Sequence, residues 1–146
     1  MGSQNLIILF CAQVLSKIPK RSEMNPEGKA ALLGFRGEFY RLYHPCGSKR
    51  ALDFFTEAIE LDPDESLWYF RKAKTLRLVK SAKSYFASNE EEIELVERAI
   101  KLRRSVTYII WLVEMYRHLG QITSKEPDNK KRDLWELNTK ILDLCK

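Results

Sequence analysis

The feature that most constrains the fold is a stripe of apolar residues at helical spacing between residues 48 and 61. Apolar side chains recur there at three- and four-residue steps: Ala51, Leu52, Phe55, Ala58, Ile59 and Leu61. This spacing places them on one face of an α-helix, because a helical turn takes about 3.6 residues. Asp62 and Pro63 follow directly and end the segment.

The rest of the chain is divided in the same way by a few helix-breaking residues. Glycine and proline are scarce, with six and five copies among 146 residues. No stretch shows the strict alternation of apolar and polar residues that a half-buried strand needs. We therefore predict an all-α fold of about seven helices joined by short loops. The expected helices span Leu6–Ile18, Pro26–Tyr43, Ser48–Leu61, Glu65–Phe86, Ser88–Arg103, Val106–Leu119 and Pro127–Leu144.

Two of these boundaries depend on local signals. Ser88 with Glu91 three residues later forms a capping-box pattern, which predicts the start of a helix. Gly120 follows Leu119, in the position just past a helix end that glycine favours.

Part of the chain repeats itself. AIELDP at Ala58–Pro63 returns as AIKLRR at Ala99–Arg104 with the apolar pattern kept. With Ala51 and Phe55, the first copy resembles the second helix of a tetratricopeptide repeat, which carries an A-x3-F…P signature. In that family alanines lie where two helices touch, a phenylalanine fills the space beside them, and a proline ends the helix.

The second copy is weaker. Glu92 and Arg104 replace the first alanine and the proline, and the spacing from Ala58 to Ala99 is 41 residues. A tetratricopeptide unit has roughly 34 residues. A different two-helix repeat is therefore an alternative.

The first helices of the units can also be aligned. Gly37–Arg41, Ala73–Arg77 and Val113–Arg117 fall in register, and Tyr116–Gly120 resembles the Y-x-x-L-G end of a tetratricopeptide first helix. The resemblance implies a tetratricopeptide-like α-solenoid of about three helical hairpins, forming a single domain over residues 1–146 that we expect to be part of a longer protein. Trp68, Trp111 and Trp135 are expected to fill the seams between hairpins.

Two other folds are alternatives. One is an unrelated helical bundle. The other follows from Trp68–Arg71, which resembles the W-x-x-R repeat of protein prenyltransferase α subunits, although the motif occurs once here.

The resemblance implies a function. Solenoids of this kind place the first helix of each hairpin on a concave wall that binds an extended peptide or a helix of a partner. We therefore expect a non-catalytic protein–protein interaction domain, an adaptor or scaffold. The candidate partner-binding residues are Arg41, Phe70, Arg71, Lys74, Arg77, Glu114 and Arg117.

Three of these residues share one register position. Arg41, Arg77 and Arg117 are expected either to form a ladder along the groove or to lie on a solvated face. A ladder would suit an acidic or phosphorylated partner segment, because guanidinium groups have donor geometry matched to carboxylate and phosphate. On a solvated face, Glu38 and Glu114 would pair with the arginines one turn later. The three aligned helices contain no asparagine, which argues against the clamp that binds chaperone tails in this family.

RNA binding is an alternative function of a different class. Interferon-induced tetratricopeptide proteins bind RNA, and the helix expected over residues 65–86 carries Arg71, Lys72, Lys74, Arg77, Lys80 and Lys83. These charges wind around a helix rather than form one flat patch. The net charge of +5 is also low for a nucleic-acid-binding domain. A third alternative is an oligomerisation module, such as a homodimer that pairs through its first or last helix.

No signature of chemistry is present. The chain has no phosphate-binding glycine loop, zinc-protease motif or nucleophile elbow, so we expect no enzyme activity and no cofactor. His44 and Cys46 flank Pro45 in a turn and lack a third catalytic partner. With two histidines in the chain, no zinc site of usual spacing is expected.

The expected location is intracellular and cytoplasmic, with the nucleus as the alternative. Three widely spaced cysteines are typical of reduced thiols. The apolar run Leu6–Leu15 is too short to cross a bilayer, so no membrane partner is expected.

Overall fold

A computed structural model describes residues 9, 13, 23–44, 47–79, 90–123, 139–140 and 142–143. Within these residues the chain is helical between short connections and contains no strand, as predicted. The helices are α2 (Pro26–Tyr43), α3 (Ser48–Leu61), α4 (Ser66–Val79), α5 (Glu90–Leu102) and α6 (Val106–Thr123). The bounds of α2 and α3 are those expected from the sequence.

The other expected helices differ at their ends or lie partly outside the described residues. The stretch 80–89 lies outside them, so the expected end at Phe86 and the capping box at Ser88 are not tested. Most of Leu6–Ile18 and Pro127–Leu144 also lies outside.

The prediction that Gly120 ends a helix is wrong, because α6 continues through it to Thr123. A glycine inside a helix costs about 1 kcal/mol relative to alanine, which a longer helix can tolerate.

The start of α2 shows how the local sequence sets a helix boundary. The side chain of Asn25 accepts a hydrogen bond of 2.8 Å from the backbone N–H of Gly28. Pro26 occupies the first helical turn, where a missing N–H is harmless, and Glu27 complements the helix dipole there. The helix ends at Tyr43, and His44 takes up extended backbone.

Small residues and one phenylalanine form the contact between α2 and α3. Ala51, Phe55 and Ala58 are fully buried on α3. Gly37 on α2 lies directly over the Phe55 ring, because a Cβ built at Gly37 would be 2.9 Å from Phe55 Cζ. Small residues thus allow the two helices to approach, and the phenylalanine fills the space beside them.

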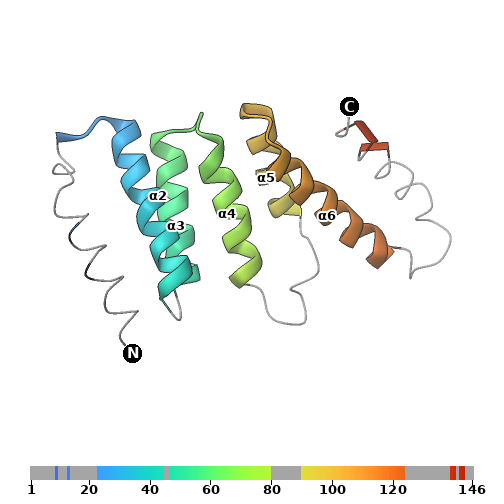
Figure 1. Cartoon of the computed structure of the whole chain (residues 1–146), viewed down its shortest axis with the longest axis horizontal. Coiled ribbons are helices and arrows are strands. Elements are labelled where there is room, and N and C mark those ends of the chain that lie inside the picture. The colour runs from blue at the N-terminus through green and yellow to red at the C-terminus, as the bar shows by residue number, and fades with distance from the viewer. Residues whose placement is uncertain are drawn as a thin grey trace.

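The second core lies between α4, α5 and α6. Its buried members come from all three helices: Phe70, Ala73, Val96, Ala99, Tyr108, Leu112, Met115 and Tyr116. Each helix packs against the next one in the chain, and α2 also contacts α4. Figure 1 shows the helices following one another along the long axis, with α6 passing in front of α5.

Two of the three tryptophans lie at contacts between helices. A Cβ at Gly34 on α2 would be 2.2 Å from Trp68 Cζ3, so the Trp68 ring of α4 occupies the space that this glycine leaves. Trp111 on α6 meets Phe70 on α4, edge to face, with ring centroids 5.7 Å apart. Trp135 lies outside the described residues. Among the described helices, none has the length and apolar character to cross a membrane.

Candidate partner-binding site

The helices predicted to share one wall, α2, α4 and α6, are joined by side-chain contacts. Glu38 on α2 pairs with Arg71 on α4. Phe70 on α4 stacks with Tyr108 on α6 at a centroid distance of 4.5 Å. The hydroxyl groups of Ser66 and Tyr108 also share a hydrogen bond of 3.4 Å. We call the region of the Glu38–Arg71 contact the α2/α4 junction. We call the region where Phe70 and Ser66 contact Tyr108 the α4/α6 junction.

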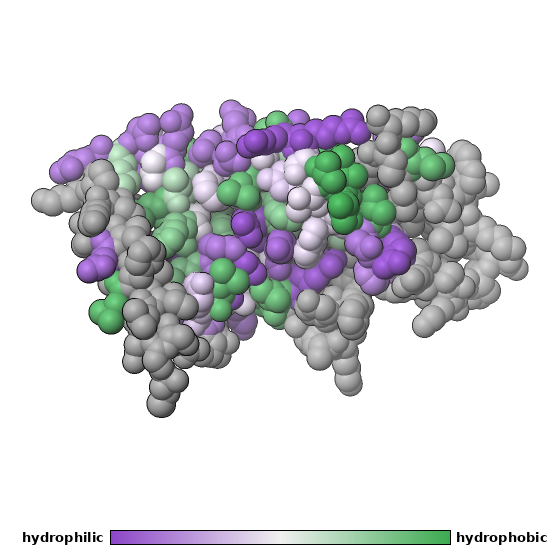
Figure 2. Space-filling view, in the orientation of Figure 1, coloured by the Kyte–Doolittle hydropathy of each residue, from purple (hydrophilic) through white to green (hydrophobic). Residues whose placement is uncertain are grey.

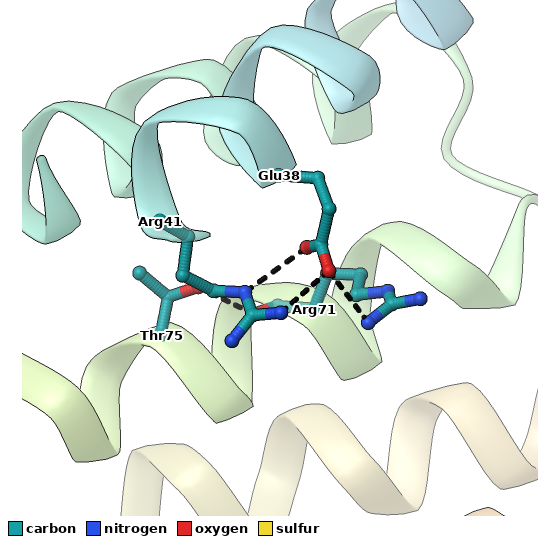
Figure 3. A network of polar contacts seen from close by, with 4 residues as sticks. All are labelled: Glu38, Arg41, Arg71 and Thr75. Atoms are coloured by element: carbon teal, nitrogen blue, oxygen red, sulfur yellow. Dashed lines mark hydrogen bonds and ion pairs between the residues drawn. The ribbon is translucent and has the colours of Figure 1, made fainter. Parts of the chain in front are cut away.

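The α2/α4 junction is centred on the carboxylate of Glu38 (Figure 3). Arg41 donates from Nε to Oε2 at 3.0 Å and from Nη2 to Oε1 at 2.5 Å. Arg71 donates from Nη1 to the same Oε1 at 2.9 Å. Two guanidinium groups from two helices therefore converge on one acid, and such charge-assisted bonds are stronger than neutral ones.

Burial and charge both act on this acid. The side chains of Glu38 and Arg71 are 25% and 31% exposed, and that of Arg41 is 12% exposed. Burial alone would raise the pKa of Glu38. The hydrogen bond from Arg41 and the charges of Arg71, Arg41 and Lys74 outweigh it, so the pKa is lowered and the carboxylate stays ionised.

Lys74 lies one helical turn beyond Arg71 and completes the group. Its Nζ is 5.7 Å from the centroid of the Phe70 ring and 5.4 Å from that of Trp111, a cation–π arrangement. Burial and the charges of Arg41 and Arg71 lower the pKa of Lys74, and Glu38 opposes this shift only in part. We call Glu38, Arg41, Arg71 and Lys74 the Glu38 cluster.

The buried hydroxyl group next to the cluster has a hydrogen-bond partner on its own helix. Thr75 is fully buried, and its hydroxyl donates to the carbonyl oxygen of Arg71 at 2.7 Å (Figure 3). This bond one turn back along the helix removes the cost of burying a hydroxyl group.

Arg77 has a different environment. Its side chain is 13% exposed, and Nη2 lies 3.7 Å from Oε2 of Glu92 on α5. Its guanidinium also lies 4.9 Å from the centroid of the Trp111 ring. Glu92, which departs from the repeat pattern in the sequence, is therefore a buried ion-pair partner that holds α5 against α4.

Arg117 is the most exposed of the three aligned arginines. It donates to Glu114 at 2.7 Å, and His118 Nε2 lies 3.9 Å from the same carboxylate oxygen. The pairs Glu38–Arg41 and Glu114–Arg117 have the three-residue spacing expected for a paired face.

The three arginines are not equivalent groups, because each one pairs with a different acid, and Arg117 is 59% exposed whereas Arg41 and Arg77 are 12% and 13% exposed. Phe70, also expected at the groove, is only 4% exposed and belongs to the core. Among the other residues expected at the groove, Arg71, Glu114 and Arg117 have more exposed side chains than Arg41 and Arg77, and Lys74 is half-buried.

Sequence reasoning missed two features. One is the role of Trp111, whose ring faces both Lys74 and Arg77. The other is an open cavity of about 470 Å³ beside Tyr116 and Glu97, between α5, α6 and residues 140 and 143. Tyr116 donates a hydrogen bond to Glu97, and burial, this bond and the Glu97 charge raise the pKa of Tyr116. Only the packing of helices shows either feature.

Within the described part of the chain, no group of three or more histidine, cysteine or acidic residues is arranged to hold a metal ion. Comparison with protein-family models, curated proteins and solved structures finds no significant match to this chain. The tetratricopeptide resemblance therefore stays a prediction from the residues that carry it.

Proposed function

We propose that this chain is a non-catalytic interaction domain that binds an extended or helical segment of a partner protein. The binding surface is the face shared by α2, α4 and α6. The observation that supports it best is the run of side-chain contacts from Glu38 through Arg71 to Phe70 and Tyr108. These contacts join α2, α4 and α6. In repeat proteins, first helices that lie side by side form a continuous binding surface.

The architecture that accompanies this function is a tetratricopeptide-like solenoid of about three hairpins. Arg71 and Lys74, with Glu114 and Arg117 further along, would contact the partner segment. Arg41 and Arg77, largely buried against acids, would hold the wall in place. The domain would then act as an adaptor or scaffold inside the cell.

The test is selection of ligands from a random peptide library, followed by calorimetry. A double variant, Arg71→Glu with Lys74→Glu, should lower the affinity for the selected peptide by about tenfold or more, because charge-assisted contacts become repulsive. The matched control is Lys101→Glu, an exposed residue on α5, which should leave the affinity unchanged. Equal loss in both variants, or loss in neither, would contradict the proposal.

A second candidate function is self-association through α6. Val106 and Ile110 lie one turn apart on this helix and are 74% and 55% exposed. Figure 2 shows apolar side chains gathered over the first half of α6 within a largely polar surface. Light scattering on the wild type and on a Val106→Ser, Ile110→Ser variant tests this function. A concentration-dependent dimer that the variant lacks would support it, and a wild-type monomer at high concentration would exclude it.

A further inference from the structure

The Glu38 cluster holds more positive than negative charge. Arg41, Arg71 and Lys74 surround one carboxylate, and each of the three contributes to lowering the pKa of Glu38. Among the described residues, no second carboxylate lies within ion-pair distance of Lys74 or Arg71. Arg41 and Arg71 thus share one acid, whereas Arg77 pairs with Glu92 and Arg117 pairs with Glu114.

The cluster also has hydrogen-bond donors to spare. A guanidinium group carries five N–H donors, and Arg71 uses one nitrogen, Nη1, on Glu38. The Lys74 ammonium has three donors, and the contacts that place it are with the Phe70 and Trp111 rings rather than with an acceptor. A further anion that approached Arg71 and Lys74 would therefore find donors on both.

The positions of these donors are fixed before any ligand arrives. Glu38 anchors Arg71 from α2, and two aromatic rings lie against Lys74. Partial burial strengthens the attraction between a ligand anion and these cations relative to bulk water. Preorganised donors lose little side-chain entropy on binding.

We propose that the Glu38 cluster is a phosphate-recognition subsite, which takes the phosphorylated side chain of a partner segment between Arg71 and Lys74. The proposal rests on the proposed function and names the class of partner. The charge count selects phosphate over carboxylate. Three cations and one carboxylate leave two positive charges, and a phosphate monoester carries about −1.5 to −2 near neutral pH.

Glu38 makes the subsite selective. Its carboxylate already occupies Arg41 and one nitrogen of Arg71, so a singly charged ligand gains little by entering. A dianion has enough charge and enough acceptor oxygens to bind the remaining donors despite repulsion from Glu38. Removal of the Glu38 charge should therefore strengthen anion binding, whereas removal of Lys74 should weaken it.

The first experiment titrates the domain with N-acetyl-phosphoserine amide and with N-acetyl-glutamate amide at matched ionic strength. NMR signals of the Arg71 and Lys74 side chains report the binding. We expect saturable shifts with the phosphoserine probe and about tenfold weaker binding of the glutamate probe, the effect of one lost charge-assisted contact. Equal affinities for the two probes, or no saturable shift with phosphoserine, would overturn the proposal.

Three variants sharpen the result, and circular dichroism checks that each one is fully folded at the temperature of the titration. Lys74→Gln should lower the affinity for the phosphoserine probe by about tenfold. Glu38→Gln should raise the affinity for the same probe. A purely structural role for Glu38 would not give this increase. Lys101→Gln, which removes an exposed cation on α5, is the control and should leave the affinity unchanged. Wild-type affinity in Lys74→Gln would contradict the subsite.

A peptide experiment separates this proposal from the proposed function. Libraries with a fixed central phosphoserine or a fixed central glutamate are selected in parallel. If both give ligands of equal affinity on the same face, the domain binds peptides and the phosphate subsite is wrong. If the phosphoserine probe binds but neither library yields a ligand, the subsite stands and the proposed function fails. A short 5′-phosphorylated RNA that binds more tightly than any selected phosphopeptide would overturn the assignment of a protein partner.

Discussion

The two junctions on α4 differ in the side chains that form them: one is charged and the other is aromatic. At the α2/α4 junction, Arg71 faces Glu38 and Arg41 in a charged, half-buried cluster. At the α4/α6 junction, the next residue back, Phe70, lies among the rings of Tyr108 and Trp111. Lys74 belongs to both, because its pKa responds to Arg41 and Arg71 and its ammonium lies against the aromatic rings.

This difference gives the two junctions of α4 different expected roles. Buried aromatic area supplies stability in proportion to the surface removed from water, whereas partly exposed ion pairs contribute little to stability. Charged groups at a half-buried site are instead well suited to recognise an anion. We therefore expect the α4/α6 junction to hold the fold and the α2/α4 junction to meet the partner.

The largest expected effect is at the aromatic junction. Phe70→Ala should lower the free energy of unfolding by about 3–5 kcal/mol, because it removes a buried ring and leaves a cavity. The measurement is chemical denaturation. Leu78→Ala on the same helix is the control, because this side chain is exposed, and it should cost less than about 0.5 kcal/mol. Similar losses in the two variants would mean that Phe70 is not a core residue.

The next effect tests close approach at the other junction. Gly34→Ala places a Cβ 2.2 Å from Trp68 Cζ3. Overpacking of this kind typically costs about 1–3 kcal/mol, even after alanine gains about 1 kcal/mol of helix propensity. A double-mutant cycle with Trp68→Phe gives the control, because a smaller ring should relieve part of the loss. Strictly additive effects would show that the two residues do not touch.

A smaller effect, and a pH dependence, are expected for Glu38→Gln. The variant should lose about 1 kcal/mol at neutral pH, since the group is partly exposed. The pKa of Glu38 in the folded state lies below the ordinary value of 4.5, so the unfolded state binds the proton more readily. The stability that the carboxylate supplies is therefore complete above about pH 4.5 and is lost as the pH falls through the folded pKa. Urea denaturation across this range should show wild type and variant converging at low pH, and a constant difference would contradict the account.

The smallest effect on stability is expected for Lys74→Gln, within about 0.5 kcal/mol at neutral pH. Loss of a cation–π contact, worth about 0.5–1 kcal/mol, is offset by relief of repulsion from Arg41 and Arg71. The folded pKa of Lys74 lies below 10.5, so wild-type stability should rise, relative to the variant, as the pH increases toward that value. Thermal unfolding in alkaline buffers measures this difference. A large destabilisation at neutral pH would make Lys74 a structural residue rather than a binding one.

Local sequence signals were sufficient to place those helix boundaries that are set by neighbouring residues in the chain. Asn25 and Pro26 start α2, and Asp62 and Pro63 end α3, so both helices lie where expected. Gly120 gave the same kind of signal and was misleading, because α6 carries on beyond it. A stop signal made of one glycine is weaker than one made of a proline, which removes a hydrogen bond and clashes with the preceding turn.

The candidate site was predictable only within single helices. The pairing of Arg41 with Glu38 follows from their three-residue spacing and was expected. That Arg71 joins the same carboxylate depends on how α4 packs against α2, which no local pattern encodes. Glu92 stands in the sequence where the repeat pattern has an alanine, and no local pattern shows that the packing of α5 on α4 buries it against Arg77.

The central claim is that the first helices, not the second ones, form the binding surface. It is tested most directly by backbone amide NMR spectra of the domain with and without its selected peptide ligand. We predict shifts along α2, α4 and α6, largest around Arg71 and Lys74, with α3 and the exposed side of α5 unchanged. Shifts confined to α3 and α5 would contradict the account.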